Sequence, residues 1–294
     1  MGPPMRARVR DTELFFDVEG MSLVPDGPRM VERPVAFLLH GGPGGDHTGF
    51  KPSYSALAER MQLVYVDHRG QGRSARGPKE TYTLDNNVED LEALRQHLGL
   101  DKIVVIGVSY GGMVALTYAS RYPDSVSHLI AVVTAPSHRF LDLAKEIVAE
   151  RGTPEQQAMA DILWAGAFAS EEQLRDYYEV MGPLYSLKFD REKARERRQR
   201  GISSVDAINE GFGGFLPTWD VTDELHKITA PTLVIGGRHD WICPPALSEL
   251  IASKIPHADL RIFEHSAHSV SADEPDAFFD AIKGFLVYNR PTDW

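Results

Sequence analysis

One serine stands in a sequence context that could make it a nucleophile. Ser109 is the central residue of a G-x-S-x-G pattern, "GVSYG", which follows the apolar run "KIVVI" and precedes the helical pattern "GMVALTYASRYP". A sharp turn between strand and helix exposes such a hydroxyl, and its glycines are needed where a Cβ would collide with the neighbouring chain. The start of the helix also favours the negative charge that develops during attack on a carbonyl. The pattern predicts nucleophilic acyl transfer.

A serine nucleophile needs a general base, and the base needs an acid that orients it. In the architecture to which this serine motif belongs, the acid follows a late strand and the histidine follows the last one. Asp240 follows the apolar run "PTLVIGG", and His268 follows "LRIFE". Both lie just past the carboxyl end of a predicted strand, where open α/β sheets bind their ligands. Ser109, Asp240 and His268 are therefore the predicted catalytic residues.

Other histidines and aspartates are weaker candidates for these roles. His265 stands three residues before His268, at the end of the strand rather than in the loop. No H-E-x-x-H pattern accompanies the two, so we expect no metal site. The remaining rivals are His239 and His257 for the base, and Asp220 and Asp223 for the acid.

The stretch "HGGPGG" at residues 40–45 predicts the second half of an oxyanion hole. It follows the run "VAFLL", and in this architecture the loop after that strand supplies one N–H while the residue after the nucleophile supplies the other. Gly42 and Tyr110 are the predicted donors, and Gly41 is a predicted substrate contact because glycine lets the backbone approach closely. The loop matches neither G-x-x-x-x-G-K-[ST] nor G-x-G-x-x-G, which argues against a phosphate site.

The elements that must position these residues follow from hydrophobic periodicity. Short, continuously apolar runs alternate with helical patterns, which predicts a mostly parallel sheet flanked by helices. An edge hairpin turning near Asp11 and Thr12 precedes them. The predicted strands are residues 35–40, 63–68, 102–109, 129–135, 231–237 and 260–264, and the predicted flanking helices include 83–100 and 275–289.

Between these strands the character of the chain changes. Successive helical patterns run from about residue 138 to 225 without a strand-like run, which predicts a four-helix cap inserted into the fold. We expect residues 1–137 and 226–294 to form the α/β core and 138–225 the cap. A minority of its aromatic residues should line an apolar pocket above Ser109. These residues are Trp164, Phe168, Tyr177, Tyr178, Tyr185, Phe212 and Phe215.

Composition excludes several classes of partner. The net charge of −11 argues against binding nucleic acid or an anionic membrane, because both need a basic face. The single cysteine, Cys243, excludes an intramolecular disulfide and a cysteine-rich zinc site, and we expect no cofactor. The sequence has no apolar run of membrane-spanning length and no signal-peptide pattern, so we expect a cytoplasmic protein acting on a small molecule or short peptide.

Three motifs together, "HGGPGG", "VDHRGQGRS" and "GVSYGGMVAL", resemble the proline iminopeptidase branch of the α/β-hydrolase superfamily. The resemblance is strong over residues 35–136 and resumes at Trp219. It implies an α/β-hydrolase fold and the same catalytic serine, aspartate and histidine as above, with Gly42 as an oxyanion donor. The loop "DHRGQGRS" at residues 67–74 is implied to shape the wall of the site.

The sequence departs from that family at one position. The resemblance implies that two acidic residues hold the substrate's free α-amine, one from the cap and one directly after the catalytic aspartate. Glu210 lies at a similar cap position, but Trp241 follows Asp240. An indole offers an ammonium a cation–π contact of about 0.5–2 kcal/mol. Losing a buried charge partner costs more.

These observations predict a serine hydrolase that forms an acyl-enzyme on small carboxylic esters, lactones or related acyl substrates, with Trp241 against an apolar acyl group. The alternative is a proline iminopeptidase that binds the amine through Glu210. A more remote alternative is a ligand-binding relative with little turnover. Ser109 argues against the members of this fold that use an aspartate nucleophile.

Overall fold

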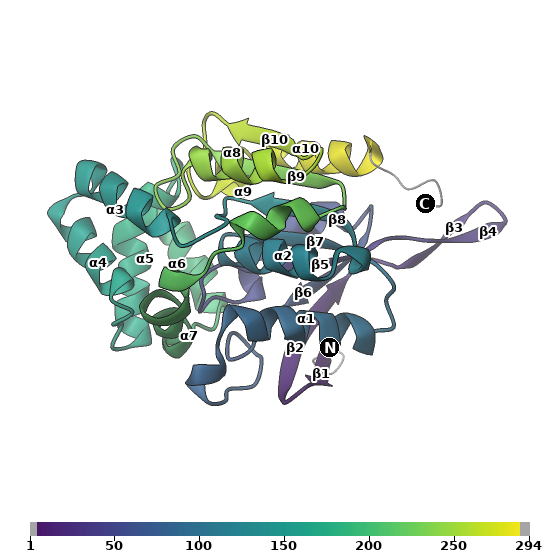
Figure 1. Ribbon diagram of the computed structural model, residues 1–294, viewed down its shortest axis with the longest axis horizontal. Helices are drawn as coiled ribbons and strands as arrows, with labels where there is room; N and C mark the ends of the chain where they lie inside the picture. Colours follow the sequence, from purple (N-terminus) through teal and green to yellow (C-terminus); the bar gives the residue numbers. More distant parts are fainter. Residues whose placement is uncertain (1–4, 289–294) are drawn as a thin grey trace.

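The structure, a computed structural model, describes residues 5–288. One large sheet lies at the centre of this part of the chain (Figure 1). Its eight strands have the order β1-β2-β6-β5-β7-β8-β9-β10. Pairing is antiparallel between β1, β2 and β6 and parallel from β6 to β10, which confirms the predicted mostly parallel sheet. The strands are β1 (Met5–Val9), β2 (Thr12–Glu19), β5 (Val35–Leu39), β6 (Gln62–Val66), β7 (Ile103–Val108), β8 (Val126–Val132), β9 (Thr232–Gly237) and β10 (Asp259–Phe263).

Helices cover both faces of this sheet because its inner strands are apolar on both sides. In β5, Phe37 and Leu39 pack into one core with helices α1, α2 and α8. Ala36 and Leu38 pack into a second core with the short helix Ser53–Leu57 and with α9 and α10. The flanking helices are α1 (Leu84–His97), α2 (Tyr110–Arg121), α8 (Pro245–Lys254), α9 (Val270–Asp273) and α10 (Pro275–Tyr288). The predicted end of the last helix, Asn289, lies outside the described residues.

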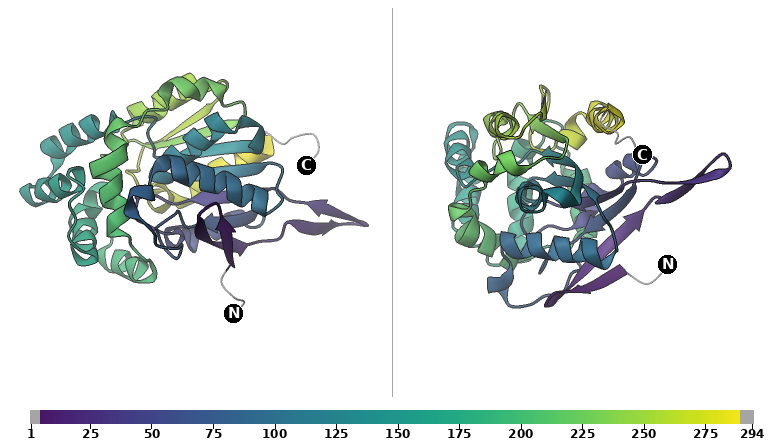
Figure 2. Two further views of the ribbon diagram at one scale, coloured as in Figure 1. Left: turned by 60° about the horizontal axis from the view of Figure 1, so that its bottom comes forward. Right: turned by 45° about the vertical axis from the view of Figure 1, so that its right-hand side comes forward.

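Two hairpins lie toward the amino-terminal end of the chain. In the β1–β2 hairpin Val9 pairs with Thr12, so the turn is Arg10–Asp11, one residue earlier than predicted. A second hairpin, β3 (Leu23–Asp26) and β4 (Arg29–Glu32), was not predicted and projects away from the body of the molecule (Figures 1 and 2). Its turn sequence "PDGP" is a strong turn signal.

A helical insertion separates β8 from β9 and gathers at one end of the molecule (Figure 2). Among the described residues it contains five α-helices, one more than predicted. An isolated antiparallel bridge between Ser137 and Asp220 joins its two ends, close to the predicted boundaries at 138 and 225, which stay predictions. The helices are α3 (Phe140–Arg151), α4 (Pro154–Trp164), α5 (Glu171–Tyr185), α6 (Arg191–Arg200) and α7 (Val205–Glu210).

None of the helices within residues 5–288 combines the length and the apolar character that crossing a membrane requires.

Candidate active site

The turn between β7 and α2 holds Ser109 in a strained backbone conformation. Its φ is 55° and its ψ is −120°, a region that non-glycine residues rarely occupy. The Ser109 N–H donates to the carbonyl of Val132 (2.9 Å), and the Thr134 hydroxyl donates to the Ser109 carbonyl (2.8 Å). The end of β8 and the segment that follows it therefore fix the backbone on both sides of the predicted nucleophile.

Glycines flank this turn because the backbones approach too closely for a side chain. A Cβ on Gly107 would lie 2.3 Å from the carbonyl oxygen of Gly111. A Cβ on Gly111 would lie 2.0 Å from the carbonyl oxygen of Leu39. Both contacts are with backbone atoms, which cannot rotate away.

Replacing Gly111 by alanine is therefore expected to destabilise the protein by roughly 3 kcal/mol or more through overpacking. Urea unfolding of the variant and the wild-type protein measures the difference. Gly284→Ala is the matched control, because nothing lies within 4 Å of a Cβ at that helical position. A Gly111→Ala protein whose free energy of unfolding lies within about 1 kcal/mol of wild type would contradict this account of the turn.

Asp240 and His268 form a direct hydrogen-bonded pair. The Nδ1 of His268 lies 2.7 Å from Oδ2 of Asp240, whose side chain is fully buried. The other oxygen, Oδ1, accepts the N–H groups of Ile242 (3.0 Å) and Cys243 (2.9 Å). Backbone bonds thus orient the carboxylate, which favours a proton on Nδ1 of His268 and leaves Nε2 free to act as a base.

The sheet brings the three predicted catalytic residues to one edge. Ser109 follows β7, Asp240 follows β9 and His268 follows β10, and β7, β8, β9 and β10 are consecutive neighbours running in parallel. Their carboxyl ends therefore lie together. Among residues 5–288, His268 is the one candidate histidine whose ring is paired with a carboxylate; the rival His265 contacts the Glu274 carboxylate through its backbone N–H.

The glycine-rich loop after β5 lies against the nucleophile. A Cβ on Gly41 would lie 3.1 Å from Cβ and 3.7 Å from Oγ of Ser109. Gly42 has a φ of 124°, a conformation that favours glycine. Tyr110 is the first residue of α2, so its N–H is one of the helix's unpaired amino-terminal donors. Its buried hydroxyl accepts the Asn87 amide at 2.6 Å, which anchors the ring.

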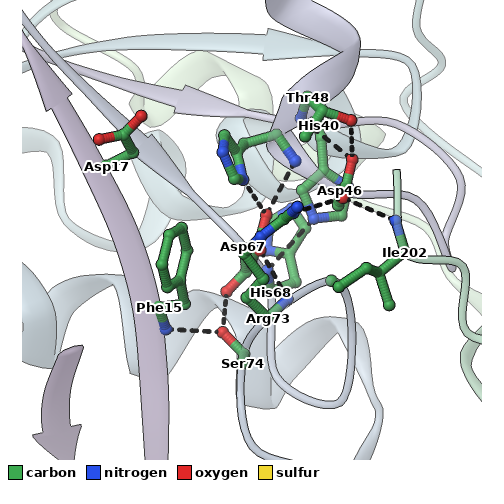
Figure 3. Close-up of polar contacts among 12 residues, drawn as sticks. Phe15, Asp17, His40, Asp46, Thr48, Asp67, His68, Arg73, Ser74 and Ile202 are labelled. Atoms are coloured by element: carbon green, nitrogen blue, oxygen red, sulfur yellow. Dashed lines mark hydrogen bonds and ion pairs between the residues drawn. The ribbon is translucent and has the colours of Figure 1, made fainter. Parts of the chain in front are cut away.

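A polar network ties the glycine-rich loop to the loop "DHRGQGRS" (Figure 3). Asp67 accepts from the N–H and ring Nδ1 of His47 (both 2.8 Å) and from the N–H of Arg73 (2.7 Å). Burial alone would raise the pKa of Asp67, but the hydrogen bonds from His47 and from the Arg73 N–H help to hold that pKa below its usual value. The carboxylate is therefore a fixed anion that gathers donors from both loops.

The same network reaches the helical insertion through Asp46. Its carboxylate accepts from the Arg73 guanidinium (2.9 Å) and from the Ile202 N–H (2.8 Å). Next to it, the Ser204 N–H donates to the carbonyl of Gly44 (2.9 Å). The link between α6 and α7 is thus bonded directly to the predicted oxyanion loop (Figure 3).

The two predicted substrate contacts outside this loop have different surroundings. Glu210 ends α7, is about a third exposed, and pairs with Lys79 at 3.4 Å. Trp241 is 1% exposed and packs against Trp164 (centroids 6.0 Å apart) and edge-on against Tyr185 (5.4 Å). Trp241 therefore belongs to an aromatic wall, and Tyr185 is the member of that wall that contacts the His268 ring, at 5.4 Å.

Sequence reasoning missed several residues that contact the predicted site residues. Lys79 pairs with Glu210 across a large separation in sequence, and no local pattern signals that contact. His40 and Asp46 flank the glycines directly, so their position was a signal that the prediction did not use. Of the aromatic residues expected in the insertion, Phe168, Tyr177 and Phe212 are buried, so they serve its packing.

The structure also bears on two other chemistries, metal binding and attack by a cysteine thiolate. Among residues 5–288, no group of three or more His, Cys, Asp or Glu side chains could hold a metal ion. Cys243 is buried, and burial raises the pKa of its thiol well above the usual value, so a thiolate nucleophile is disfavoured.

Comparisons with known proteins add four findings. A family model described as alpha/beta hydrolase fold matches residues 34–275. Proline iminopeptidase PfmaB from Pestalotiopsis fici is 34% identical over 92% of this chain and 98% of that protein. Among solved structures, a proline iminopeptidase from Mycobacterium smegmatis has a TM-score of 0.76 at 22% identity, covering 98% of each chain. An esterase (EaEST) from Exiguobacterium antarcticum has a TM-score of 0.74 at 21% identity, covering 97% of this chain and 100% of that one.

Proposed function

The chain belongs to the α/β-hydrolase family and is a proline iminopeptidase-like hydrolase, and we propose that it cleaves small carboxylic esters or lactones through an acyl-enzyme on Ser109. The observation that carries the proposal is the buried Asp240–His268 pair, held at the same sheet edge as the strained serine. This constellation supports acyl transfer whichever substrate it receives.

The proposed reaction has two halves. As Oγ of Ser109 attacks the substrate carbonyl, Nε2 of His268 takes the hydroxyl proton. The N–H groups of Gly42 and Tyr110 donate to the resulting oxyanion, and each such donor is worth about 3 kcal/mol in enzymes of this type. Collapse breaks the bond to the leaving alcohol, which takes the proton from His268. Water, deprotonated by the same nitrogen, then attacks the acyl carbonyl; the bond to Oγ breaks, Oγ of Ser109 takes the proton back from His268, and the acid is released.

The charges around the site favour an uncharged substrate over one with a free amine. Trp241 stands directly after Asp240 and carries no charge, and its buried indole packs in the aromatic wall. The carboxylate of Glu210 already has a cation beside it, Lys79. An incoming ammonium would have to compete with that lysine, whereas the acyl group of an ester needs only the apolar wall.

The second candidate is a proline iminopeptidase, which the name of the 34% identical relative favours. The test is kcat/KM on three compounds: a proline aryl amide with a free amine, the same amide N-acetylated, and a short-chain aryl ester. We expect the two amides to differ little and the ester to be cleaved far faster. A preference of about a hundredfold for the free amine, near 2.7 kcal/mol, would establish the iminopeptidase instead.

The variant Lys79→Met tests directly whether Lys79 competes with a substrate ammonium for the carboxylate of Glu210. Removing the lysine should raise the ratio of kcat/KM for the free amide over the N-acetylated amide by up to about fivefold, because exposed ion pairs are worth up to about 1 kcal/mol. The double variant with Glu210→Gln should lose this gain, and ester hydrolysis should not change in either. If Glu210→Gln alone abolished a strong free-amine preference, Glu210 would be the amine site despite its partner.

A further inference from the structure

His40, the residue before the glycines, is buried and uses both ring nitrogens in hydrogen bonds to backbone. Its Nδ1 lies 2.8 Å from the carbonyl oxygen of Gly41. Its Nε2 accepts the backbone N–H of His68 at 3.2 Å. The ring therefore joins the predicted oxyanion loop to the start of the neighbouring "HRGQGRS" segment (Figure 3).

These two bonds allow only one form of the ring. A backbone N–H always donates, so Nε2 of His40 must be unprotonated to accept from His68. The proton must then be on Nδ1, which donates it to the Gly41 carbonyl. Burial also lowers the pKa of His40, which favours the neutral ring despite the nearby carboxylate of Asp67.

The hydrogen bond from the His40 ring to the Gly41 carbonyl also orients the N–H of Gly42. The Gly41 carbonyl and the Gly42 N–H belong to one planar peptide, and in the trans form they point in opposite directions. A carbonyl held toward the His40 ring turns the Gly42 N–H away from that ring. The same backbone lies against the predicted nucleophile, because a Cβ on Gly41 would lie 3.1 Å from Cβ and 3.7 Å from Oγ of Ser109.

We propose that His40 is a positioning residue for the oxyanion hole: its Nδ1–H fixes the Gly41–Gly42 peptide so that the Gly42 N–H faces the oxyanion. The proposal rests on the proposed acyl transfer at Ser109. Tight packing supports it, because a Cβ on Gly45 would lie 2.8 Å from the same Gly41 oxygen and 3.5 Å from Nδ1 of His40. The peptide, the ring and Gly45 therefore hold one another in place.

The substitutions His40→Asn and His40→Gln test the two hydrogen bonds of the His40 ring separately. In His40→Asn, the side-chain amide can put an N–H near the position of Nδ1 and keep the bond to Gly41. In His40→Gln, the longer side chain can put its oxygen near the position of Nε2 and accept from His68, but it loses the bond to Gly41. His97, an exposed residue at the end of α1, supplies the matched controls His97→Asn and His97→Gln.

The measurement is kcat and KM for a short-chain aryl ester, with melting temperature as a check on folding. We expect His40→Gln to lower kcat about 30- to 100-fold with KM nearly unchanged, because an oxyanion donor acts mainly in the transition state. His40→Asn should keep at least a third of the wild-type kcat. Equal losses in both variants, or an effect on KM alone, would overturn the proposal.

A second test of the proposal uses the wild-type protein and requires neither the variants nor turnover of a substrate. Nitrogen-15 NMR of the histidine rings should show His40 neutral with the proton on Nδ1. A proton on Nε2 would overturn the inference even if the variants failed to fold. If the wild-type protein shows that proton on Nδ1 but does not cleave the ester, the proposed substrate class fails and the ring geometry stands.

Discussion

Replacing Ser109 by alanine is expected to lower kcat for ester hydrolysis by about 10⁵- to 10⁶-fold, the loss that follows removal of the nucleophile in serine hydrolases of this mechanism. Alanine keeps the Cβ and leaves both backbone bonds to the Val132 and Thr134 positions in place. The fold and the oxyanion donors should therefore survive, and only the covalent step is lost. Single-turnover kinetics with an aryl ester measure the effect.

A fluorophosphonate probe provides the companion experiment. It should label the wild-type protein at Ser109 and leave Ser109→Ala unlabelled. Ser253→Ala is the matched control, since Ser253 is an exposed serine in α8 whose hydroxyl donates to a carbonyl of its own helix. A wild-type protein that neither reacts with the probe nor turns over an ester would favour the ligand-binding alternative.

Asp240→Asn is expected to lower kcat by about 10⁴-fold while leaving the protein folded. The asparagine oxygen can still accept the N–H groups of Ile242 and Cys243, which places the amide NH₂ toward His268. A donor at that position forces Nδ1 of His268 to accept, so the proton moves to Nε2 and the ring can no longer take a proton from Ser109.

The alanine variant separates this tautomer effect from stability. Asp240→Ala leaves the same two N–H groups buried without an acceptor, so it should lose about 1–3 kcal/mol of stability for each unpaired group. Asp240→Asn should lose much less. Asp223→Asn, at an exposed rival position, is the control for both measurements. A kcat for Asp240→Asn within tenfold of wild type would mean that the carboxylate does not orient the base.

The sequence predicted most of the sheet because buried parallel strands are continuously apolar. The predicted strands at residues 35–40 and 231–237 coincide with β5 and β9 to within one residue. The carboxyl ends of such strands share one edge, so placing Asp240 and His268 after two of them was enough to predict their proximity, which the 2.7 Å hydrogen bond confirms. The apolar pattern predicted the strands, and the geometry of a parallel sheet predicted that Asp240 and His268 lie close together.

The contacts between loops and insertion could not be predicted in the same way. Asp46 meets Ile202 because the end of α6 packs against the loop after β5, and Lys79 meets Glu210 because α7 packs against the short helix Lys79–Thr81 after β6. Such contacts depend on the path of a long insertion, and no periodicity encodes that path. The β3–β4 hairpin was missed for another reason: its strands are short and largely exposed, so they lack the apolar pattern of buried strands.

The bridge between Ser137 and Asp220 has an evolutionary consequence. It holds the exit and the re-entry of the insertion side by side, so everything between them is, topologically, a single loop between two adjacent strands. Loop-closure entropy grows slowly, by about 0.6 kcal/mol for each doubling of loop length, so the sheet tolerates inserts of very different size. Recombination of one contiguous gene segment can therefore replace the helical insertion and leave the codons of Ser109, Asp240 and His268 untouched.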